Sequence, residues 1–145
     1  MDSLLKVSII VPTLNEAQGL TETLTQIQQL SPYELVVSDG GSHDCTLKIA
    51  EEFTEHVVKG SAGRALQMNA GARVATGDIF LFLHADSRIE PASFEKMLHS
   101  LGGSENIGGA FSLCIDSDKW YLRLITELAN LRSKYFGMAY GDQAF

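Results

Sequence analysis

Residues 6–16 read KVSIIVPTLNE, and this stretch decides the fold class. Its first part, Lys6–Pro12, is a run of β-branched apolar residues that ends in a proline, which is typical of a strand buried on both faces of a sheet. Such strands occur mainly in parallel sheets that helices cover on either side. The stretch therefore predicts an α/β domain built around this strand.

Strands and helices alternate along the rest of the chain. The sequence predicts further strands at 34–39, 56–58, 78–83 and 109–115, and helices that include 20–30, 47–53, 64–75, 91–101 and 119–132. Pro91 stands where a first helical residue is expected, because its fixed φ suits that position. This alternation predicts βαβ units, a mostly parallel sheet and helices on both of its faces.

Length, charge and cysteine content narrow the function classes. The 145 residues are expected to form one domain, residues 1–145, and the net charge of -7 without a Lys/Arg cluster disfavours a nucleic-acid partner. The longest apolar run, Ile79–Leu83, is far shorter than the roughly 20 residues of a membrane-spanning helix. Two isolated cysteines, Cys45 and Cys114, are typical of reduced thiols and predict a cytoplasmic protein.

Polar residues follow four of the predicted strands, where ligands gather in open α/β sheets. Any one of them alone is better explained as a cap of a turn or helix, but four successive strand ends of this kind favour a binding site. A cation such as Mg²⁺ or Mn²⁺ prefers oxygen ligands and often takes one carboxylate plus substrate phosphates. The residues at these strand ends are Asn15 and Glu16, Asp39, Gly63 and Arg64, and His84 and Asp86.

Other candidate motifs are absent or better explained as structural. The pair in Asp116-Ser117-Asp118 precedes a predicted helix, where capping is the favoured role. The segment Gly60–Arg64 opens a helix but is neither GxGxxG nor GxxxxGK[ST], so dinucleotide and P-loop signatures are missing. No GxSxG nucleophile elbow is present, which removes the α/β-hydrolase interpretation.

The segments VSIIVPTLNE, VVSDGGSHDCT and GRALQMNAGARVATGDIFLFLHAD resemble, in order, the motifs of family 2 glycosyltransferases. The segments GRALQMNAGA, FLHADSR and GDQAF are most similar in sequence to the bacterial arsenosugar-biosynthesis-type subgroup of this family. The resemblance implies the Rossmann-like GT-A fold of nucleotide-diphospho-sugar transferases. It also implies an enzyme that transfers a sugar, with inversion, from a nucleotide-diphosphate sugar to the hydroxyl of an acceptor that the motifs do not identify.

The resemblance assigns roles to particular residues. Pro12, Asn15 and Glu16 match the motif that lies against the nucleotide, and Asp39 matches the acid that contacts its base. Arg64 matches a basic position near the base and diphosphate. Asp86 matches the last acid of the DxD-type motif, which holds a divalent cation, Mg²⁺ or Mn²⁺; His84 occupies the first acidic position and is a candidate second ligand.

The chain departs from the family pattern near its end. Family members continue past the GDQ segment into an ED motif whose Asp is the general base, so the domain is expected to be truncated before that motif. Asp142 is then the candidate base. The alternative function is a truncated nucleotide-sugar-binding domain with little or no catalytic activity. An unpaired strand edge where the sheet should continue would also favour a homo-oligomer.

Two further function classes are alternatives to this assignment. A nucleotidyltransferase on a similar sheet would carry a Gly-rich loop with Arg or Lys directly after the first strand, and Asn15-Glu16 at that place disfavours it. A plain protein-interaction module would bind no nucleotide at all. Nucleotide binding therefore separates the enzyme and binding-domain interpretations from the interaction module.

Overall fold

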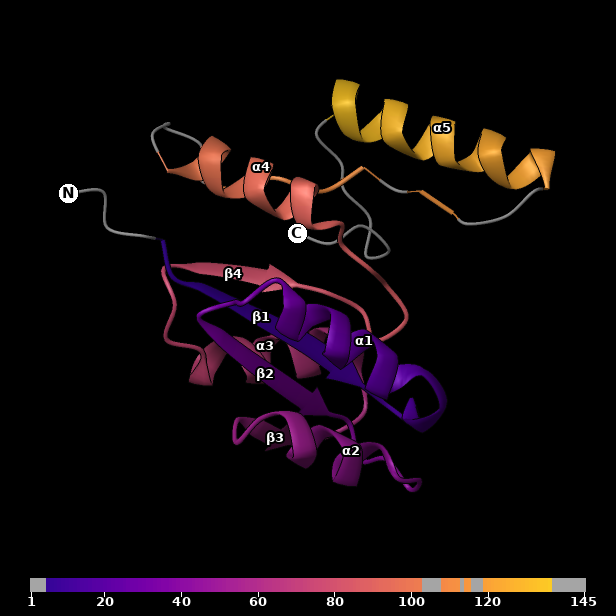
Figure 1. The fold of residues 1–145 in the computed structure, drawn as a ribbon. Helices are drawn as coiled ribbons and strands as arrows, with labels where there is room; N and C mark the ends of the chain where they lie inside the picture. Colours follow the sequence, from indigo (N-terminus) through magenta and orange to yellow (C-terminus); the bar gives the residue numbers. More distant parts are fainter. Residues whose placement is uncertain (1–4, 103–107, 113, 116–118, 137–145) are drawn as a thin grey trace.

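The structure is a computed structural model that describes residues 5–102, 108–112, 114–115 and 119–136, with side chains described up to Leu131 in the last helix (Figure 1). Helices and strands alternate as the sequence predicts. The elements in chain order are β1 Val7–Thr13, α1 Ala17–Gln29, β2 Glu34–Asp39, α2 Thr46–Phe53, β3 Val57–Lys59, α3 Arg64–Val74, β4 Ile79–Phe82, α4 Pro91–Leu101 and α5 Trp120–Phe136.

The four strands form one parallel sheet in the order β3-β2-β1-β4. Strand β1 pairs with β2 from Ser8 opposite Glu34 up to Thr13 opposite Asp39. The chain places β2 and β3 on one side of β1 and then crosses to place β4 on the other side. The strand order therefore reverses beside β1, and such a switch point is where open α/β sheets bind ligands, outside the carboxyl ends of the strands.

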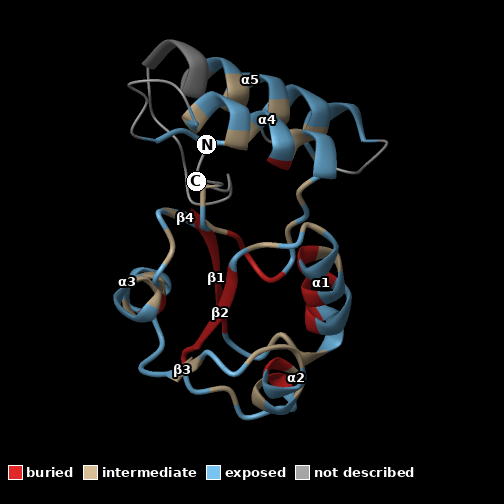
Figure 2. Cartoon of the chain, turned by 60° about the vertical axis from the view of Figure 1, so that its left-hand side comes forward, coloured by how far each residue is buried: buried red, intermediate tan, exposed pale blue. Residues whose placement is uncertain are grey.

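Helices cover both faces of the sheet, as predicted (Figure 2). Helices α1 and α2 lie on one face, where Val7, Ile9 and Val11 of β1 pack in the same hydrophobic core as Leu20 and Leu24 of α1. Helix α3 lies on the opposite face. All seven residues of β1 are buried, so the sequence-based interpretation of this stretch as a strand buried on both faces is confirmed.

Helix α3 approaches the sheet unusually closely. A Cβ atom added at Gly71 would lie 2.5 Å from Cγ2 of Ile10, which is closer than packed carbon atoms allow. The glycine is therefore what lets α3 lie directly on β1. This close packing fixes the distance between α3 and the sheet, and so helps to position the N-terminus of α3 relative to the ends of β1 and β2.

The prediction of a strand at 109–115 is wrong for the part of this segment that is described. Residues 108–112 and 114–115 contain no strand. The adjacent glycines Gly108 and Gly109 disfavour a strand, because glycine has no side chain to pack and loses the most backbone entropy on ordering. Phe111 alone among these residues packs against the hydrophobic core, so one contact replaces the expected strand pairing.

Helices α4 and α5 lie beyond the β4 edge of the sheet (Figures 1 and 2). Helix α4 begins at Pro91 as predicted, and its Phe94 is buried in the core. The apolar residues of α5 remain largely exposed, with Trp120 at 75% and Leu128 at 56%. Among the helices described, none combines the length and hydropathy that a membrane span requires.

Candidate functional site

The side chain of Asp39, the last residue of β2, organises the loop that follows it. Only 1% of Asp39 is exposed. Its Oδ2 accepts hydrogen bonds from the backbone N–H groups of Gly41 at 2.9 Å and Ser42 at 2.8 Å. Its Oδ1 accepts from the hydroxyls of Ser42 and Thr13. Four donors thus occupy the roughly four acceptor positions of an ionised carboxylate.

These hydrogen bonds keep Asp39 ionised. Burial by itself would raise the pKa of Asp39, because a desolvated carboxylate is less stable than the neutral acid. The hydrogen bonds from the side chain and backbone of Ser42, from Gly41 and from Thr13 outweigh burial and hold the pKa below its ordinary value. Asp39 is therefore a fixed negative charge at the carboxyl edge of the sheet.

Asn15 ties the loop after β1 to the loop after β2. Its φ of 56° lies in the left-handed region, which Asn tolerates better than most residues. In this conformation its backbone N–H donates to Oγ of Ser42 at 2.9 Å, and its Oδ1 accepts from the N–H of His43 at 2.9 Å. The two loops therefore form one connected surface.

The N-termini of α1 and α2 are joined in the same way. The N–H of Glu16 donates to Oγ1 of Thr46 at 2.8 Å, and the N–H of Ala17 donates to Oδ2 of Asp44 at 3.2 Å. Oδ1 of Asp44 also accepts from the N–H of Thr46, so this carboxylate serves both helix starts. Hydrogen bonds from the hydroxyl and N–H of Thr46 lower the pKa of Asp44.

Helix α3 reaches the same loops through Gln67, which is 5% exposed. The side-chain amide of Gln67 donates to the carbonyl oxygen of Thr13 at 2.6 Å and to that of Ser38 at 3.2 Å. Its Oε1 accepts from the N–H of Gly63 at 3.3 Å. Arg64, the first residue of α3, is exposed at this end of the helix.

Pro12 lies inside β1 rather than at its end. It is buried and stands opposite Ser38 of β2. Strand β1 continues one residue beyond the predicted boundary, to Thr13. A proline is tolerated here because β4 pairs with β1 only up to Ile10, so the missing N–H interrupts no pairing on that side.

Asp86 and His84 follow β4, on the other side of β1 from Asp39. Asp86 is exposed, and its Oδ1 accepts from the hydroxyl of Ser87 at 3.3 Å. His84 is only 9% exposed. The hydroxyl of Thr23 in α1 donates to the carbonyl oxygen of Ala85 at 2.6 Å, which fixes this loop against α1.

Within the described residues, no group of three or more His, Cys, Asp or Glu side chains is placed to hold a metal ion. A cation at the carboxyl edge of the sheet would therefore need ligands from substrate phosphates and water as well as from these side chains. Exposed Asp86 fits that donor set, because Mg²⁺ commonly binds one or two carboxylates together with substrate phosphates and water.

The structure brings most of the predicted site residues to one edge of the sheet. Asn15, Glu16 and Asp39 belong to one hydrogen-bonded unit, Arg64 lies at the start of the helix that Gln67 joins to it, and Asp86 lies across β1. Asp142 falls outside the described residues. Sequence reasoning did not assign to the site the residues that hold the unit together, namely Thr13, Ser42, Asp44, Thr46 and Gln67. Polar residues directly after strands were the available signal for the loop residues, whereas Gln67 lies inside the predicted helix, in the segment GRALQMNAGA that carries the family resemblance.

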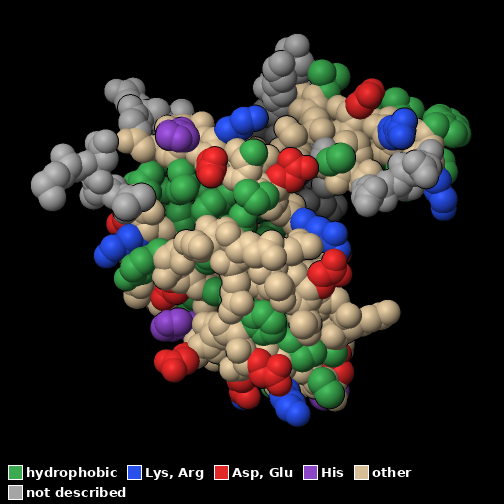
Figure 3. Space-filling view, viewed as in Figure 1, with side chains coloured by type: hydrophobic (Ala, Val, Ile, Leu, Met, Phe, Trp, Pro, Cys, Tyr) green, Lys and Arg blue, Asp and Glu red, His purple; other side chains and the backbone are tan. Residues whose placement is uncertain are grey.

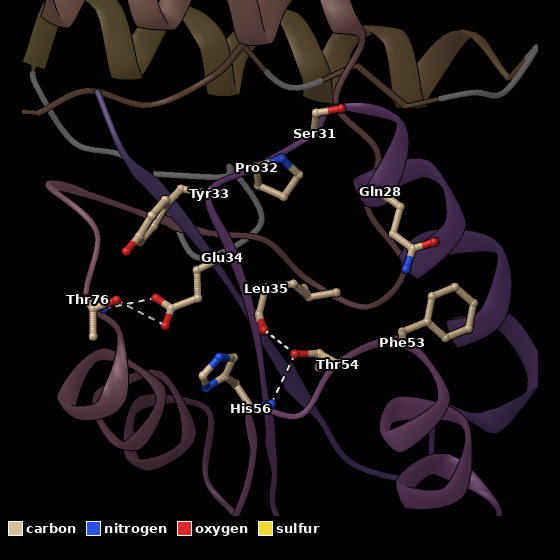
Figure 4. A pocket seen from close by; sticks show the side chains of 10 residues that line it. All are labelled: Gln28, Ser31, Pro32, Tyr33, Glu34, Leu35, Phe53, Thr54, His56 and Thr76. Atoms are coloured by element: carbon tan, nitrogen blue, oxygen red, sulfur yellow. Dashed lines mark hydrogen bonds between the residues drawn. The ribbon is translucent and has the colours of Figure 1, made fainter. Parts of the chain in front are cut away.

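A cavity of about 630 Å³ lies at the opposite edge, beside the amino end of β2 (Figure 4). Tyr33, Glu34, Thr54 and His56 are among its lining residues. Burial would raise the pKa of Glu34, but hydrogen bonds from Ser8 and Thr76 hold it below its ordinary value. This cavity is separate from the polar loops at the carboxyl edge.

Charge is dispersed over the face of the molecule seen in Figure 3. Lys and Arg side chains appear there singly, among Asp and Glu side chains, and they form no continuous basic surface. A surface that tracks a nucleic-acid backbone carries clustered Lys and Arg. This face therefore lacks the charge pattern of a nucleic-acid-binding surface.

A parallel α/β sheet with polar loops joined at its carboxyl edge is the architecture of doubly wound ligand-binding domains. Within that class, the model of Glycosyl transferase family 2 matches residues 8–143. The chain belongs to this family, as the sequence motifs predicted.

Comparison with individual relatives agrees with this assignment. The chain is 30% identical over 112 residues to a dolichol-phosphate mannosyltransferase of Pyrococcus furiosus, covering 71% of the chain and 32% of the relative. It is 39% identical over 94 residues to a PGL/p-HBAD biosynthesis glycosyltransferase of Mycobacterium bovis, covering 59% of the chain and 37% of the relative. The chain thus spans about a third of the length of these curated relatives.

Solved structures show the same fold. TarS 1-349 of S. aureus matches with a TM-score of 0.57 and 26% identity, covering 66% of this chain and 32% of that one. Glucosyl-3-phosphoglycerate synthase of Mycobacterium tuberculosis, solved with Mn²⁺, UDP and glucosyl-3-phosphoglycerate, matches with a TM-score of 0.60 and 24% identity, covering 70% and 41%. The fold is therefore the GT-A fold predicted from the sequence.

Proposed function

We propose that this chain is the donor-binding domain of a glycosyltransferase that moves a sugar from a nucleotide-diphosphate sugar to an acceptor hydroxyl, with inversion at the anomeric carbon. One observation carries the proposal: the loops after β1 and β2 are joined through Asp39, Asn15 and Ser42 at the carboxyl edge of the sheet. A family 2 sequence over residues 8–143 supports the reaction class.

In this proposal the nucleotide lies against the joined loops. Asn15 and Glu16 form the base-proximal side together with the loop that Asp39 orders, and buried Pro12 supports it from within β1. Because the fourfold hydrogen bonding of Asp39 fixes the backbone of Gly41 and Ser42, the loop is ordered before the nucleotide arrives. Such preorganisation lowers the entropy lost on binding.

The diphosphate is proposed to lie between the N-terminus of α3 and the loop after β4. The N-terminus of a helix is favourable for phosphate, and Arg64 adds a full positive charge there. Asp86, with His84 as the candidate second ligand, would hold Mg²⁺ or Mn²⁺. When bound, the cation would stabilise the negative charge that grows on the leaving diphosphate.

Inversion requires a base for the acceptor hydroxyl. The hydroxyl must lose its proton as it attacks the anomeric carbon, so a carboxylate within hydrogen-bond reach is needed. Asp142 is proposed for this role. Loss of a positioned general base typically slows a reaction about 10²–10⁴-fold, so this residue separates turnover from donor binding.

We place the proposed reaction in the cytoplasm. Cys45 and Cys114 are both free and exposed, and exposed thiols persist unpaired in a reducing compartment. Labelling of both thiols without prior reduction, in protein taken directly from cells, would agree with this location. A disulfide in that protein would contradict it.

The direct test measures binding and turnover separately. Titration calorimetry with UDP and with GDP, each with and without Mn²⁺, measures donor-side binding, and release of nucleotide from a panel of nucleotide sugars measures reaction. We expect 1:1 binding that Mn²⁺ strengthens. Binding without reaction would favour the nucleotide-sugar-binding domain of low activity, and no binding of either nucleotide would contradict the proposal.

A further inference from the structure

We infer that Gln67 is a positioning residue that sets the N-terminus of α3, and with it Arg64, relative to the loops after β1 and β2. The inference rests on the proposed function, since it says how the parts of that donor site are held together. It concerns a residue that contacts backbone only in the described hydrogen bonds and is not itself proposed to touch the nucleotide.

Both the nitrogen and the oxygen of the Gln67 side-chain amide have hydrogen-bond partners. Its two N–H groups have two acceptors, the carbonyl oxygens of Thr13 at 2.6 Å and Ser38 at 3.2 Å, which lie at the ends of β1 and β2. Its oxygen accepts from the N–H of Gly63, directly before Arg64. One side chain thus joins the carboxyl ends of two strands and the start of a helix.

The surroundings of Gln67 leave it little freedom. The residue is 5% exposed, and a buried amide that lost its partners would carry an uncompensated desolvation cost. A Cβ added at Gly40 would lie 2.9 Å from Cδ of Gln67 and 3.1 Å from Cα of Ala62. The glycine therefore admits the amide, and the N–H of Gly40 donates to the same oxygen of Thr13.

The position of Gln67 in α3 makes its effect on Arg64 direct. The two residues are three apart in one helix, so they are neighbours on its surface, about one turn from each other. Gly63, at the helix start, has a φ of 142°, and its N–H donates to Oε1 of the same Gln67 side chain that is bonded to the strand ends. Releasing Gln67 would therefore release the turn that presents Arg64.

Two substitutions disturb this arrangement from opposite sides. Gln67→Met keeps the length of the side chain but removes all three hydrogen bonds. Gly40→Ala leaves the amide intact but pushes against it. Asn69→Ala, at an exposed position of α3, is the matched control on the same helix, and Ile27→Val is a control for modest loss of core packing at a site outside the loops.

The experiment measures UDP binding with Mn²⁺ by calorimetry and backbone hydrogen exchange without ligand, on the whole chain. We expect Gln67→Met and Gly40→Ala to weaken UDP binding about tenfold or more, by analogy with residues that orient metal ligands, whose loss costs about 10–100-fold. Exchange should rise at residues 13–16, 40–42 and 63 in both variants. The two control variants should change the UDP affinity less than about twofold, well below the tenfold loss expected of Gln67→Met and Gly40→Ala.

Each failure has its own meaning. If the unchanged chain binds no nucleotide, the proposed function fails, while the exchange data still test the inference. Unchanged exchange at these loops in Gln67→Met would overturn the inference. It would also be overturned if Gln67→Met only lowered stability, as Ile27→Val does, while its folded form bound UDP as tightly as the unchanged chain.

Discussion

The carboxylate of Asp39 is buried and yet ionised, because four hydrogen bonds replace the water that burial removes. Its neighbours depend on it in turn. Without the carboxylate, the N–H groups of Gly41 and Ser42 and the hydroxyl of Thr13 would lose their acceptor. The residue therefore sets both the stability of the loop and the surface that the loop offers to a ligand.

Asp39→Ala should lower both stability and nucleotide affinity. Leaving a buried donor without a partner typically costs about 1–3 kcal/mol, so we expect a lower free energy of unfolding by about that amount. We also expect a clear loss of UDP affinity, measured by calorimetry. Glu52→Ala, which removes an exposed acid from α2, is the control and should change neither. Unchanged UDP affinity in Asp39→Ala would remove Asp39 from the proposed site.

Asp86→Ala should act on the metal dependence of binding. Because Asp86 is an exposed carboxylate four residues after β4, its removal should abolish the increase in UDP affinity that Mn²⁺ produces, with little effect on binding without metal. Glu95→Gln on the exposed face of α4 should leave the Mn²⁺ effect intact. A Mn²⁺ effect that survives in Asp86→Ala would place the cation elsewhere.

At the scale of elements, the packing of α3 on the sheet depends on a residue without a side chain. Gly71 is buried and nearly touches Ile10, whereas Gly19 in α1 has nothing within 4 Å of an added Cβ. Both are helical glycines, so intrinsic helix propensity favours alanine at both. Comparing alanine substitutions at the two glycines therefore separates the effect of close packing from the effect of helix propensity.

Gly71→Ala and Gly19→Ala should therefore have opposite effects. Replacing an exposed helical glycine by alanine gains up to about 1 kcal/mol, and we expect Gly19→Ala to be stabilising. Gly71→Ala should destabilise by about 1–3 kcal/mol, since the added methyl forces α3 away from β1. Urea denaturation midpoints measure both. A stabilised Gly71→Ala would show that α3 is less closely packed than described.

Helix α5 shows that an amphipathic sequence pattern does not determine whether the apolar face of a helix is buried. The sequence predicted the helix, and the helix is present at Trp120–Phe136. The helix was predicted to be amphipathic, yet the apolar residues Trp120, Leu124, Leu128 and Leu131 are about half exposed or more. Periodicity reports which side chains share a face of a helix, but whether that face is covered depends on tertiary packing.

For the whole molecule, the lowered pKa values of two buried carboxyls predict how stability depends on pH. The ordinary values are 4.5 for Glu34 and 3.8 for Asp39, and both are lowered by hydrogen bonds in the fold. A carboxyl with a lower pKa when folded stabilises the fold at pH above its unfolded pKa, and this contribution is lost as the pH falls through the folded pKa. The free energy of unfolding should therefore fall as the pH drops below 4.5.

Glu34→Gln tests the share of one group in this pH dependence. The variant should be less stable at neutral pH, because an amide cannot accept from Ser8 and Thr76 as the carboxylate does. It should also show a shallower loss of stability on acidification. Glu52→Gln, at an exposed position, should follow the unchanged chain. Equal acid slopes for Glu34→Gln and the unchanged chain would contradict the assignment.

Self-association stays a prediction. Strand β4 is an edge strand of the described sheet, and its Phe80 is 40% exposed. An unpaired edge with exposed apolar side chains favours pairing with another chain. Sedimentation velocity at rising concentration should then show species larger than the monomer, and one monomeric boundary at all concentrations would contradict this expectation.

The sequence predicted the parallel α/β sheet well because buried strands and strand-end residues are local signals. Lys6–Pro12 and Asp39 carry such signals in their immediate neighbours. Gln67 does not, since its partners at Thr13 and Ser38 are 54 and 29 residues away in the chain. The predicted strand at 109–115 failed for the opposite reason. Its local sequence contains β-branched and aromatic residues, but within the described residues no strand lies beside it to pair with.

The central claim is that nucleotide binds the joined loops at the carboxyl edge of the sheet, and a chemical-shift map tests it most directly. UDP with Mg²⁺ is titrated into isotope-labelled protein while backbone amide signals are followed. We predict the largest changes at residues 13–16, 40–44, 63–64 and 84–87, and little change at Tyr33, Glu34 and His56 around the cavity at the amino edge. Changes centred on that cavity, or none anywhere, would contradict the account.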